Sequence, residues 1–132
     1  MTTVSKKLLV VDDLADWRIT IKGVLKDEKY NVATAESIKD AISLLEKEKY
    51  ALALLDLRLD ERDEGNTDGL ELAKIIRKHW SKTKIIMVTG YGTTKILIKA
   101  MEPDKKGISL VDDYLPKGDT DKLVETVKRV LG

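Results

Sequence analysis

The residues Tyr50-Ala51-Leu52-Ala53-Leu54-Leu55-Asp56 decide how the rest of the chain is interpreted. Five consecutive apolar residues are too few to cross a membrane, and they predict a strand that is buried on both faces. The run ends abruptly in Asp56. A carboxylate is almost never fully buried without a partner, so we expect Asp56 to meet other charged groups.

Two further apolar runs end in the same way. The run at residues 8–11 is followed by Asp12 and Asp13. The run at residues 85–88 is followed by Thr89. The carboxyl ends of parallel strands lie at one edge of an open sheet, where such sheets bind their ligands. The three runs therefore predict a polar site at one edge of a parallel sheet.

Apolar runs alternate along the whole chain with segments whose apolar residues repeat at helical spacing. The expected strands are residues 7–11, 31–33, 50–56, 84–89 and 108–115. The expected helices are residues 13–28, 38–49 behind a Ser37 cap, a helix capped by Thr67 or Asp68 that reaches His79, then 94–101 and 119–131. This alternation predicts an α/β fold: a doubly wound, five-stranded parallel sheet with five helices on its two faces. Residues 1–132 are expected to form a single domain, because no linker or repeat interrupts the pattern.

The composition excludes several classes of function. The chain has no cysteine, which removes disulfides, thiolate nucleophiles and sulfur-bound zinc. Its 24 basic and 23 acidic side chains nearly balance, so the charge favours neither nucleic acid nor an anionic membrane as a partner. The longest apolar runs are of strand length, and no signal peptide is evident. We therefore expect a cytoplasmic protein.

If Asp12, Asp13 and Asp56 converge, their charges must be compensated. Two carboxylates about 4 Å apart repel by roughly 4 kcal/mol at an effective dielectric constant of about 20. An oxygen-only donor set without histidine favours a hard cation, and a few carboxylates with water suit Mg²⁺ better than Ca²⁺. An aspartate beside such an ion can act as a nucleophile on phosphorus. Thr89 offers a hydroxyl donor to a phosphoryl group, and Lys117, after the last strand, offers a positive charge.

Over essentially its whole length the chain resembles the receiver domain of two-component response regulators. The matching residues, all at the ends of predicted strands, are Asp12, Asp13, Asp56, Thr89 and Lys117. The resemblance implies a flavodoxin-like sheet with the strand order 2-1-3-4-5. It also implies that Asp56 accepts a phosphoryl group from a sensor histidine kinase or a histidine phosphotransfer protein. The chain would then be a signalling phosphoacceptor that assists only its own phosphorylation and dephosphorylation, and not an enzyme toward other molecules.

The resemblance also implies a metal-binding arrangement. Asp13, Asp56 and the main-chain carbonyl of Arg58 would bind Mg²⁺ directly. Asp12 would act on the ion mainly through water. The cofactor implied by the family is therefore Mg²⁺ alone.

Further residues would respond to the phosphoryl group. Thr89 and Lys117 would hold its oxygens. Thr89 and Tyr114 would form a switch that remodels the face of the fourth helix, fifth strand and fifth helix. An unknown downstream protein, or a second copy of the chain, would bind that face. Arg58 and Tyr91 would tune the lifetime of the phosphoryl group by obstructing the attack of water.

Three features depart from the family pattern. The Asp68-Gly69 pair follows Asp56 by twelve residues instead of about seven, so the intervening loop is longer and heavily charged. Lys117 is followed by Gly118 where the family usually has proline. The segment before the last strand is extended around residues 103–107.

The same residues allow other interpretations. Asp12-Asp13 alone would also suit the start of a helix, and Asp112-Asp113 is expected to be a solvated flank of the last strand. A phosphorylation-independent interaction module that keeps the acidic pocket is the alternative function. A phosphatase with an aspartate nucleophile is disfavoured, because such enzymes carry a second aspartate two residues on, where this chain has Arg58.

Overall fold

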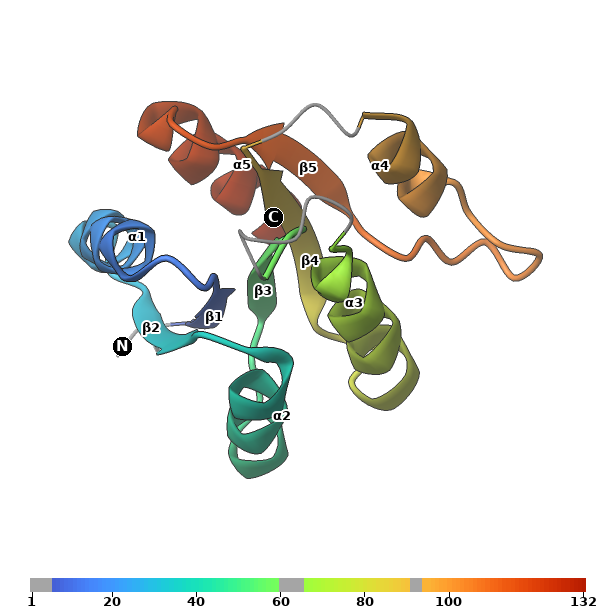
Figure 1. Ribbon diagram of the computed structural model, residues 1–132, viewed down its shortest axis with the longest axis horizontal. Coiled ribbons are helices and arrows are strands. Elements are labelled where there is room, and N and C mark those ends of the chain that lie inside the picture. The colour runs from blue at the N-terminus through green and yellow to red at the C-terminus, as the bar shows by residue number, and fades with distance from the viewer. Residues whose placement is uncertain (1–5, 60–65, 91–93) are drawn as a thin grey trace.

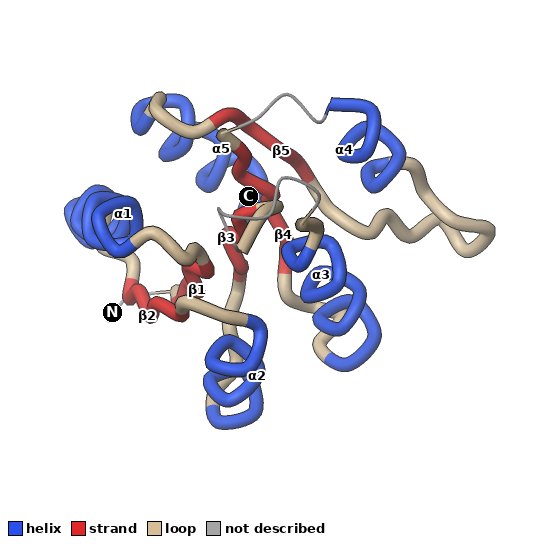
Figure 2. The backbone as a smooth tube through the Cα atoms, viewed as in Figure 1, coloured by secondary structure: helices blue, strands red, loops and turns tan. Residues whose placement is uncertain are grey.

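The computed structural model describes residues 6–59, 66–90 and 94–132, which form one parallel sheet with helices on both faces (Figure 1; Figure 2). The strands are β1 Lys7–Val11, β2 Asn31–Ala35, β3 Leu52–Asp56, β4 Lys84–Thr89 and β5 Asp113–Pro116. The helices are α1 Ala15–Asp27, α2 Ile38–Lys47, α3 Asp68–His79, α4 Thr94–Met101 and α5 Thr120–Leu131. The strand order is β2-β1-β3-β4-β5, with parallel pairing throughout. The predicted fold class and strand order are confirmed.

Each face of the sheet carries its own hydrophobic core. In β3, Leu52 and Leu54 pack with α1 and α5, whereas Ala53 and Leu55 pack with α2, α3 and α4. β1 and β4 alternate in the same way, as side chains of period two must. Both faces are covered, which explains why these strands are continuous apolar runs in the sequence. Asp56, two residues after Leu54, points to the same face of the sheet as Leu52 and Leu54, the face covered by α1 and α5.

The starts of two helices show how local polar groups set their boundaries. Ser37 caps α2 as predicted, because its hydroxyl accepts the main-chain N–H three residues on. α1 begins at Ala15, later than the predicted Asp13. The Asp12 carboxylate accepts the N–H of Leu14 at 2.9 Å, which holds these residues in a turn before the helix.

The last strand is shorter than predicted, because β5 begins at Asp113 and not at Ile108. The Asp112 main-chain N–H donates to the carbonyl of Ile85 at 2.8 Å. The Asp112 carboxylate, and not a main-chain carbonyl, accepts the N–H of Ile85 at 2.8 Å. At the start of β4, a side-chain carboxylate thus takes the place of the main-chain carbonyl that a neighbouring strand would offer. The residues before Asp113 are therefore not part of β5.

The prediction that Asp112-Asp113 is a solvated flank is wrong. A guanidinium nitrogen of Arg77 in α3 lies 3.1 Å from the Asp112 carboxylate and donates also to the carbonyl of Leu110. The Asp113 carboxylate pairs with Arg129 of α5. Both aspartates are partly buried and join the edge of the sheet to the helices on either side.

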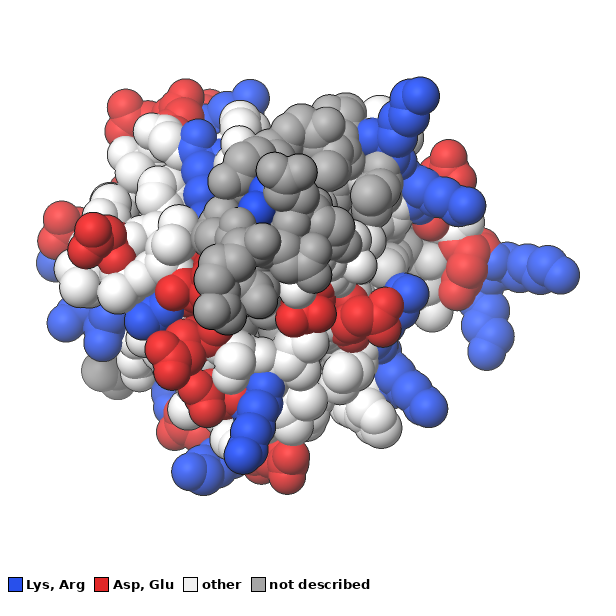
Figure 3. Space-filling view, in the orientation of Figure 1, with Lys and Arg blue, Asp and Glu red and all other residues white. Residues whose placement is uncertain are grey.

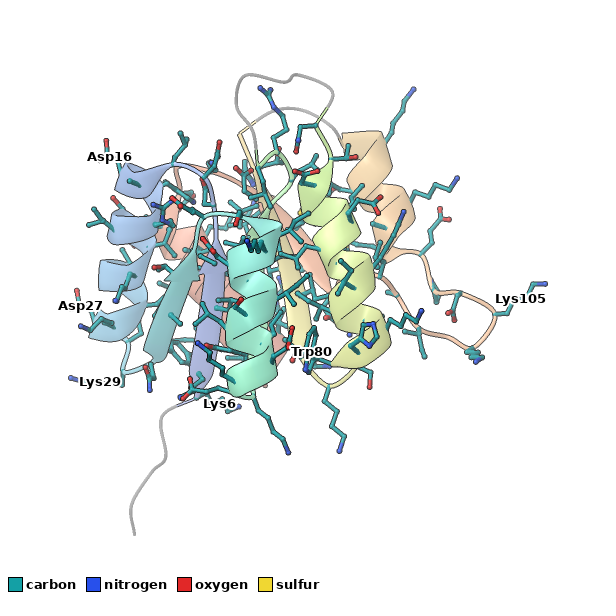
Figure 4. The ribbon with its side chains drawn as sticks, turned by 60° about the horizontal axis from the view of Figure 1, so that its bottom comes forward. Lys6, Asp16, Asp27, Lys29, Trp80 and Lys105 are labelled. Atoms are coloured by element: carbon teal, nitrogen blue, oxygen red, sulfur yellow. The ribbon has the colours of Figure 1, made fainter. Side chains whose placement is uncertain are left out.

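The predicted extension before β5 is an ordered turn. The Asp104 carboxylate accepts the N–H groups of Lys106 and Ile108 at 2.8 and 3.0 Å. Figure 4 shows Lys105 projecting from the tip of this turn, away from the rest of the molecule. Acidic and basic side chains are interspersed over the described residues visible in Figure 3, in keeping with the near-zero net charge. No helix in the described ranges is both long and apolar enough to span a membrane.

Candidate functional site

Two aspartates that end neighbouring strands lie side by side at the carboxyl edge of the sheet. β1 pairs with β3 so that Val11 is opposite Leu55, which places Asp12 next to Asp56. Only 1% of Asp12 and 3% of Asp56 is exposed. The two strands therefore deliver both carboxylates into the interior, as the sequence predicted from their apolar runs.

Asp13 completes an acidic cluster with these two residues. Each of Asp12, Asp13 and Asp56 offers a carboxylate oxygen, and these oxygens lie within 4.8 Å of one another. At such a separation two ionised carboxylates repel by about 3 kcal/mol or more at an effective dielectric constant of about 20. Burial, above all, raises the pKa of Asp12 above its ordinary value, although hydrogen bonds to the carboxylate oppose the shift. The oxygen-only donor set and its charge fit a hard divalent cation.

Lys117 supplies one compensating charge. Its ammonium lies 2.8 Å from Asp12 Oδ2 and 3.2 Å from Asp56 Oδ2. Burial alone would lower the pKa of Lys117, but the hydrogen bond and charge of Asp12 and the charge of Asp56 outweigh it, so the pKa is raised. Lys117 is thus a firmly protonated cation between two buried carboxylates.

The main chain around Asp12 is held from three sides. Its N–H donates to the carbonyl of Ala35 at 3.1 Å, and its carboxylate accepts the N–H of Leu14. Arg18 of α1 donates to the Asp12 carbonyl at 2.6 Å. Arg18 was not predicted as part of the site, although its place one helical turn beyond Leu14 points it back toward the end of β1. The carboxylate of Asp12 is therefore positioned before any ligand arrives.

Thr89 and Lys117 are joined through the backbone. Thr89 is the last residue of β4, and its carbonyl accepts the N–H of Lys117 at 2.9 Å. The chain then turns at Gly118, whose φ of +109° favours glycine over any residue with a side chain. No cis peptide bond occurs in the described ranges. Lys117 thus reaches the two carboxylates although glycine, and not the proline of the family pattern, follows it.

The long loop after Asp56 still returns to the end of β3. The N–H of Gly69 donates to the carbonyl of Leu57 at 3.0 Å. A Cβ placed on Gly69 would come within 2.1 Å of the Asp56 carbonyl oxygen and 2.8 Å of Leu57 Cα. Only glycine allows α3 to begin this close to the main chain of Asp56 and Leu57. The displaced Asp68-Gly69 pair thus has a structural role despite the extra residues before it.

Asn66 closes the same loop. Its side-chain oxygen accepts the N–H of Leu59 at 3.1 Å and that of Asp68 at 3.0 Å. The prediction that Thr67 or Asp68 caps α3 is wrong: Thr67 stands at the cap position without a side-chain capping bond, and Asp68 is already the first residue of the helix. The Asn66 side chain accepts the N–H of Asp68 instead. Most of the charged loop predicted from 60 to 67 lies outside the described residues.

The other predicted site residues are Arg58, Tyr114 and Tyr91. Arg58 is buried, with 7% of its surface exposed. Tyr114 is half-buried in β5, opposite Met87, and packs against the core under α2, α3 and α4. Tyr91, predicted to tune the phosphoryl lifetime, lies outside the described residues. Trp17 of α1 is a further neighbour, because its ring centroid is 5.6 Å from the Lys117 ammonium.

Comparison with known proteins identifies the same pattern. The family model for the response regulator receiver domain matches residues 8–128. A putative NtrX-like response regulator of Rickettsia bellii is 32% identical over 123 residues, covering 92% of this chain and 24% of the relative. The transcriptional regulatory protein SrrA of Staphylococcus aureus is 33% identical over 86% of this chain and 42% of its own length. The chain spans about a quarter of the length of the NtrX-like relatives.

Solved structures agree with the sequence matches. TrrA of Thermotoga maritima, in complex with Mg²⁺ and BeF, superposes with a TM-score of 0.78 at 31% identity, covering 95% of this chain and 98% of TrrA. A CheY-like receiver domain protein of Methanospirillum hungatei superposes with a TM-score of 0.81 at 29% identity, covering 97% and 94% of the two chains. The chain therefore belongs to the response regulator receiver domains, the phosphoacceptor domains of two-component signalling.

Proposed function

We propose that Asp56 of this chain accepts a phosphoryl group, with Mg²⁺ bound beside it, from a phosphohistidine of a sensor histidine kinase or a histidine phosphotransfer protein. The observation that supports this role is the meeting of buried Asp56 with Asp12, Asp13 and the Lys117 ammonium at one edge of the sheet. A buried carboxylate held among other carboxylates and one cation is suited to transfer of an anionic group.

The transfer is a substitution at phosphorus. A carboxylate oxygen of Asp56 forms the new P–O bond while the bond from phosphorus to the donor's imidazole nitrogen breaks. The imidazole leaves with that electron pair, and Asp56 becomes an acyl phosphate. Lys117 stands 3.2 Å from Asp56 Oδ2, so a short movement of its flexible stem brings the ammonium to a phosphoryl oxygen. Thr89, at the end of the neighbouring strand β4, is proposed to donate its hydroxyl to a second phosphoryl oxygen.

The donor set is prepared for a cation. Asp13, Asp56 and the main-chain carbonyl of Arg58 are the proposed direct ligands, with Asp12 acting through a water molecule. When bound, Mg²⁺ supplies positive charge against the carboxylates and a coordination position for a phosphoryl oxygen. The bonds from Leu14 and Arg18 keep Asp12 in place while the charge of the cluster changes.

Phosphorylation is proposed to alter the surface of α4, β5 and α5. Thr89 ends β4, and Tyr114 lies on the neighbouring strand β5, so movement of the Thr89 hydroxyl toward a phosphoryl group opens space next to the half-buried tyrosine. The partner that reads this surface is a downstream protein, a further domain of the same regulator or a second copy of the chain. Buried Arg58, two residues after Asp56, and Tyr91 are proposed to slow hydrolysis of the phosphoryl group. The chain is further proposed to assist only its own phosphorylation and dephosphorylation.

The test is the intact mass of the protein after incubation with acetyl phosphate, with and without Mg²⁺. The wild type is expected to gain one phosphoryl group only with Mg²⁺, and Asp56→Asn none. Asp112→Asn is a matched control, since it neutralises another partly buried aspartate whose partners are Arg77 and the N–H of Ile85. It should gain the group as the wild type does.

Uptake by Asp56→Asn, or none by the folded wild type under any condition, would contradict the proposal. The second result, together with binding to a partner that is unchanged in Asp56→Asn, would establish the phosphorylation-independent interaction module.

A further inference from the structure

The Lys117 ammonium has an aromatic neighbour besides its two carboxylates. The nitrogen lies 5.6 Å from the centroid of the Trp17 ring, within the range of a cation–π interaction. The same atom is 2.8 Å from Asp12 Oδ2 and 3.2 Å from Asp56 Oδ2. An indole from α1 thus stands beside the cation that is proposed to receive the phosphoryl oxygens.

The position of the ring follows from the pattern of α1. Trp17, Ile21 and Leu25 are spaced by four residues, so they share the helix face that packs on the sheet. Trp17 packs against the core under α1 and α5, and with Asp12 and Asp56 it lines a cavity of about 10 Å³. A space of that size holds one water molecule at most. The ring therefore packs closely beside the residues that carry the two carboxylates.

The side chain of Lys117 is long and flexible, so its orientation depends on the groups that hold its ammonium. Lys117 follows the edge strand β5 and precedes Gly118, and its side chain has four flexible carbons. The carboxylates of Asp12 and Asp56 attract the ammonium. A bound divalent cation would compete for those carboxylates and weaken their hold on Lys117. The attraction of the indole does not depend on the charge of the carboxylates and would persist.

We propose that Trp17 is a positioning residue for Lys117, keeping the ammonium at the edge of the site so that it can receive a phosphoryl oxygen on Asp56. This inference rests on the proposed role of Lys117 in phosphoryl transfer. Trp17 itself touches neither the phosphoryl group nor the donor in this scheme, and acts only through the orientation of Lys117.

The first experiment compares the rate of phosphorylation by acetyl phosphate at saturating Mg²⁺, measured by intact mass, in Trp17→Leu and Trp17→Tyr. Leucine keeps an apolar side chain without a π face, and tyrosine keeps the π face. Trp17→Leu is expected to slow uptake about two- to fivefold, the size of one partly exposed cation–π interaction, and Trp17→Tyr to retain most of the rate. Trp80→Leu is the matched control, since Figure 4 shows Trp80 at the opposite end of the molecule from Asp16, the neighbour of Trp17. It should leave the rate unchanged.

A double-mutant cycle separates positioning from a general structural effect. In a Lys117→Met background, Trp17→Leu is expected to cause no further slowing, because there is no ammonium left to position. Slowing by the same factor in both backgrounds would overturn the proposal. So would a Trp17→Tyr variant that is as slow as Trp17→Leu while both have the thermal stability of the wild type.

An NMR measurement reads the contact without any phosphorylation. The side-chain resonances of Lys117 near its ammonium should shift in Trp17→Leu, because the ring current of the indole is lost, and should not shift in Trp80→Leu. The shift should persist at saturating Mg²⁺. Lys117 resonances that are unaffected by Trp17→Leu would refute the positioning role. If the wild type shows the ring contact but takes up no phosphoryl group, only the proposed function is refuted.

Discussion

Replacing Gly69 by alanine tests how the long loop after Asp56 is fitted to the site. The added Cβ would stand 2.1 Å from the Asp56 carbonyl oxygen, 2.8 Å from Leu57 Cα and 2.9 Å from the Asp56 carbonyl carbon. All three are main-chain atoms, so no side chain can rotate away to relieve the clash. Either β3 or the start of α3 has to move.

The magnitude follows from two opposing effects. Overpacking against atoms that cannot relax costs typically up to about 3 kcal/mol. Alanine in place of glycine in a helix returns at most about 1 kcal/mol. We therefore expect Gly69→Ala to lower the free energy of unfolding by about 2 kcal/mol. With a urea m-value of about 2 kcal/mol/M, the unfolding midpoint falls by about 1 M.

The assay is urea unfolding followed by circular dichroism, with Gly23→Ala as the matched control. Gly23 lies inside α1, and a Cβ there would meet nothing within 4 Å. Gly23→Ala is therefore expected to raise the free energy of unfolding by about 0.5–1 kcal/mol, the opposite sign for the same substitution. The same samples, incubated with acetyl phosphate and Mg²⁺, should show slower phosphorylation in Gly69→Ala alone, because the displaced atoms belong to Asp56.

One result would refute this reasoning. If Gly69→Ala were as stable as the wild type and took up the phosphoryl group at the same rate, the close approach of α3 to the acceptor strand would not constrain the site. The departure of this chain from the usual Asp-Gly spacing would then have no consequence for Asp56.

Three further predictions concern Asp12, Arg77 and the pair Arg58 and Tyr91. Asp12→Asn is expected to raise the free energy of unfolding of the metal-free protein at about pH 7 by about 1 kcal/mol, because it removes one of three crowded carboxylates, while weakening the response to Mg²⁺. Burial raises the pKa of Asp12 in the folded state, so the wild type takes up a proton at Asp12 and becomes relatively more stable as the pH falls. The difference in unfolding free energy between Asp12→Asn and the wild type should therefore shrink as the pH approaches the ordinary value of 3.8. Urea titrations at several pH values measure this, and a difference that is constant with pH would contradict it. Arg77→Ala is expected to lower the free energy of unfolding by about 2 kcal/mol, since a partly buried carboxylate and several carbonyls lose a charged donor. Calorimetry measures this, with the exposed residue Lys78 changed to alanine as the control. Equal stabilities of the two variants would count against the prediction. The double variant Arg58→Ala, Tyr91→Ala should lose its phosphoryl group faster than the wild type, because less bulk then obstructs water; mass spectrometry over time checks this, and slower loss from the variant would exclude it.

Much of the fold follows from short-range signals. A strand buried on both faces must be a continuous apolar run, so the three central strands are evident in the sequence, and so is the polar residue that ends each of them. Because parallel strands place their carboxyl ends at one edge, the nearness of Asp12, Asp13 and Asp56 could also be predicted.

The last strand shows where such signals fail. Residues 108–115 have the composition of a strand, yet β5 begins only at Asp113. The difference arises from the Asp112 carboxylate, which bonds the main chain of Ile85 and pairs with Arg77 of α3. Neither partner is a near neighbour of Asp112 in the sequence, so no local pattern could indicate the boundary.

Periodicity and burial act over a few residues, and they were enough to predict the sheet, its helices and the residues that end the central strands. The close approach of Gly69 to the main chain of Asp56, and the position of the Trp17 ring beside the Lys117 ammonium, could be found only in the folded molecule. Those contacts join segments that are far apart in the chain, and their geometry depends on how α1, α3 and β5 pack around the same sheet edge. These groups meet because the elements that carry them pack together, and no local pattern of residue types encodes that packing.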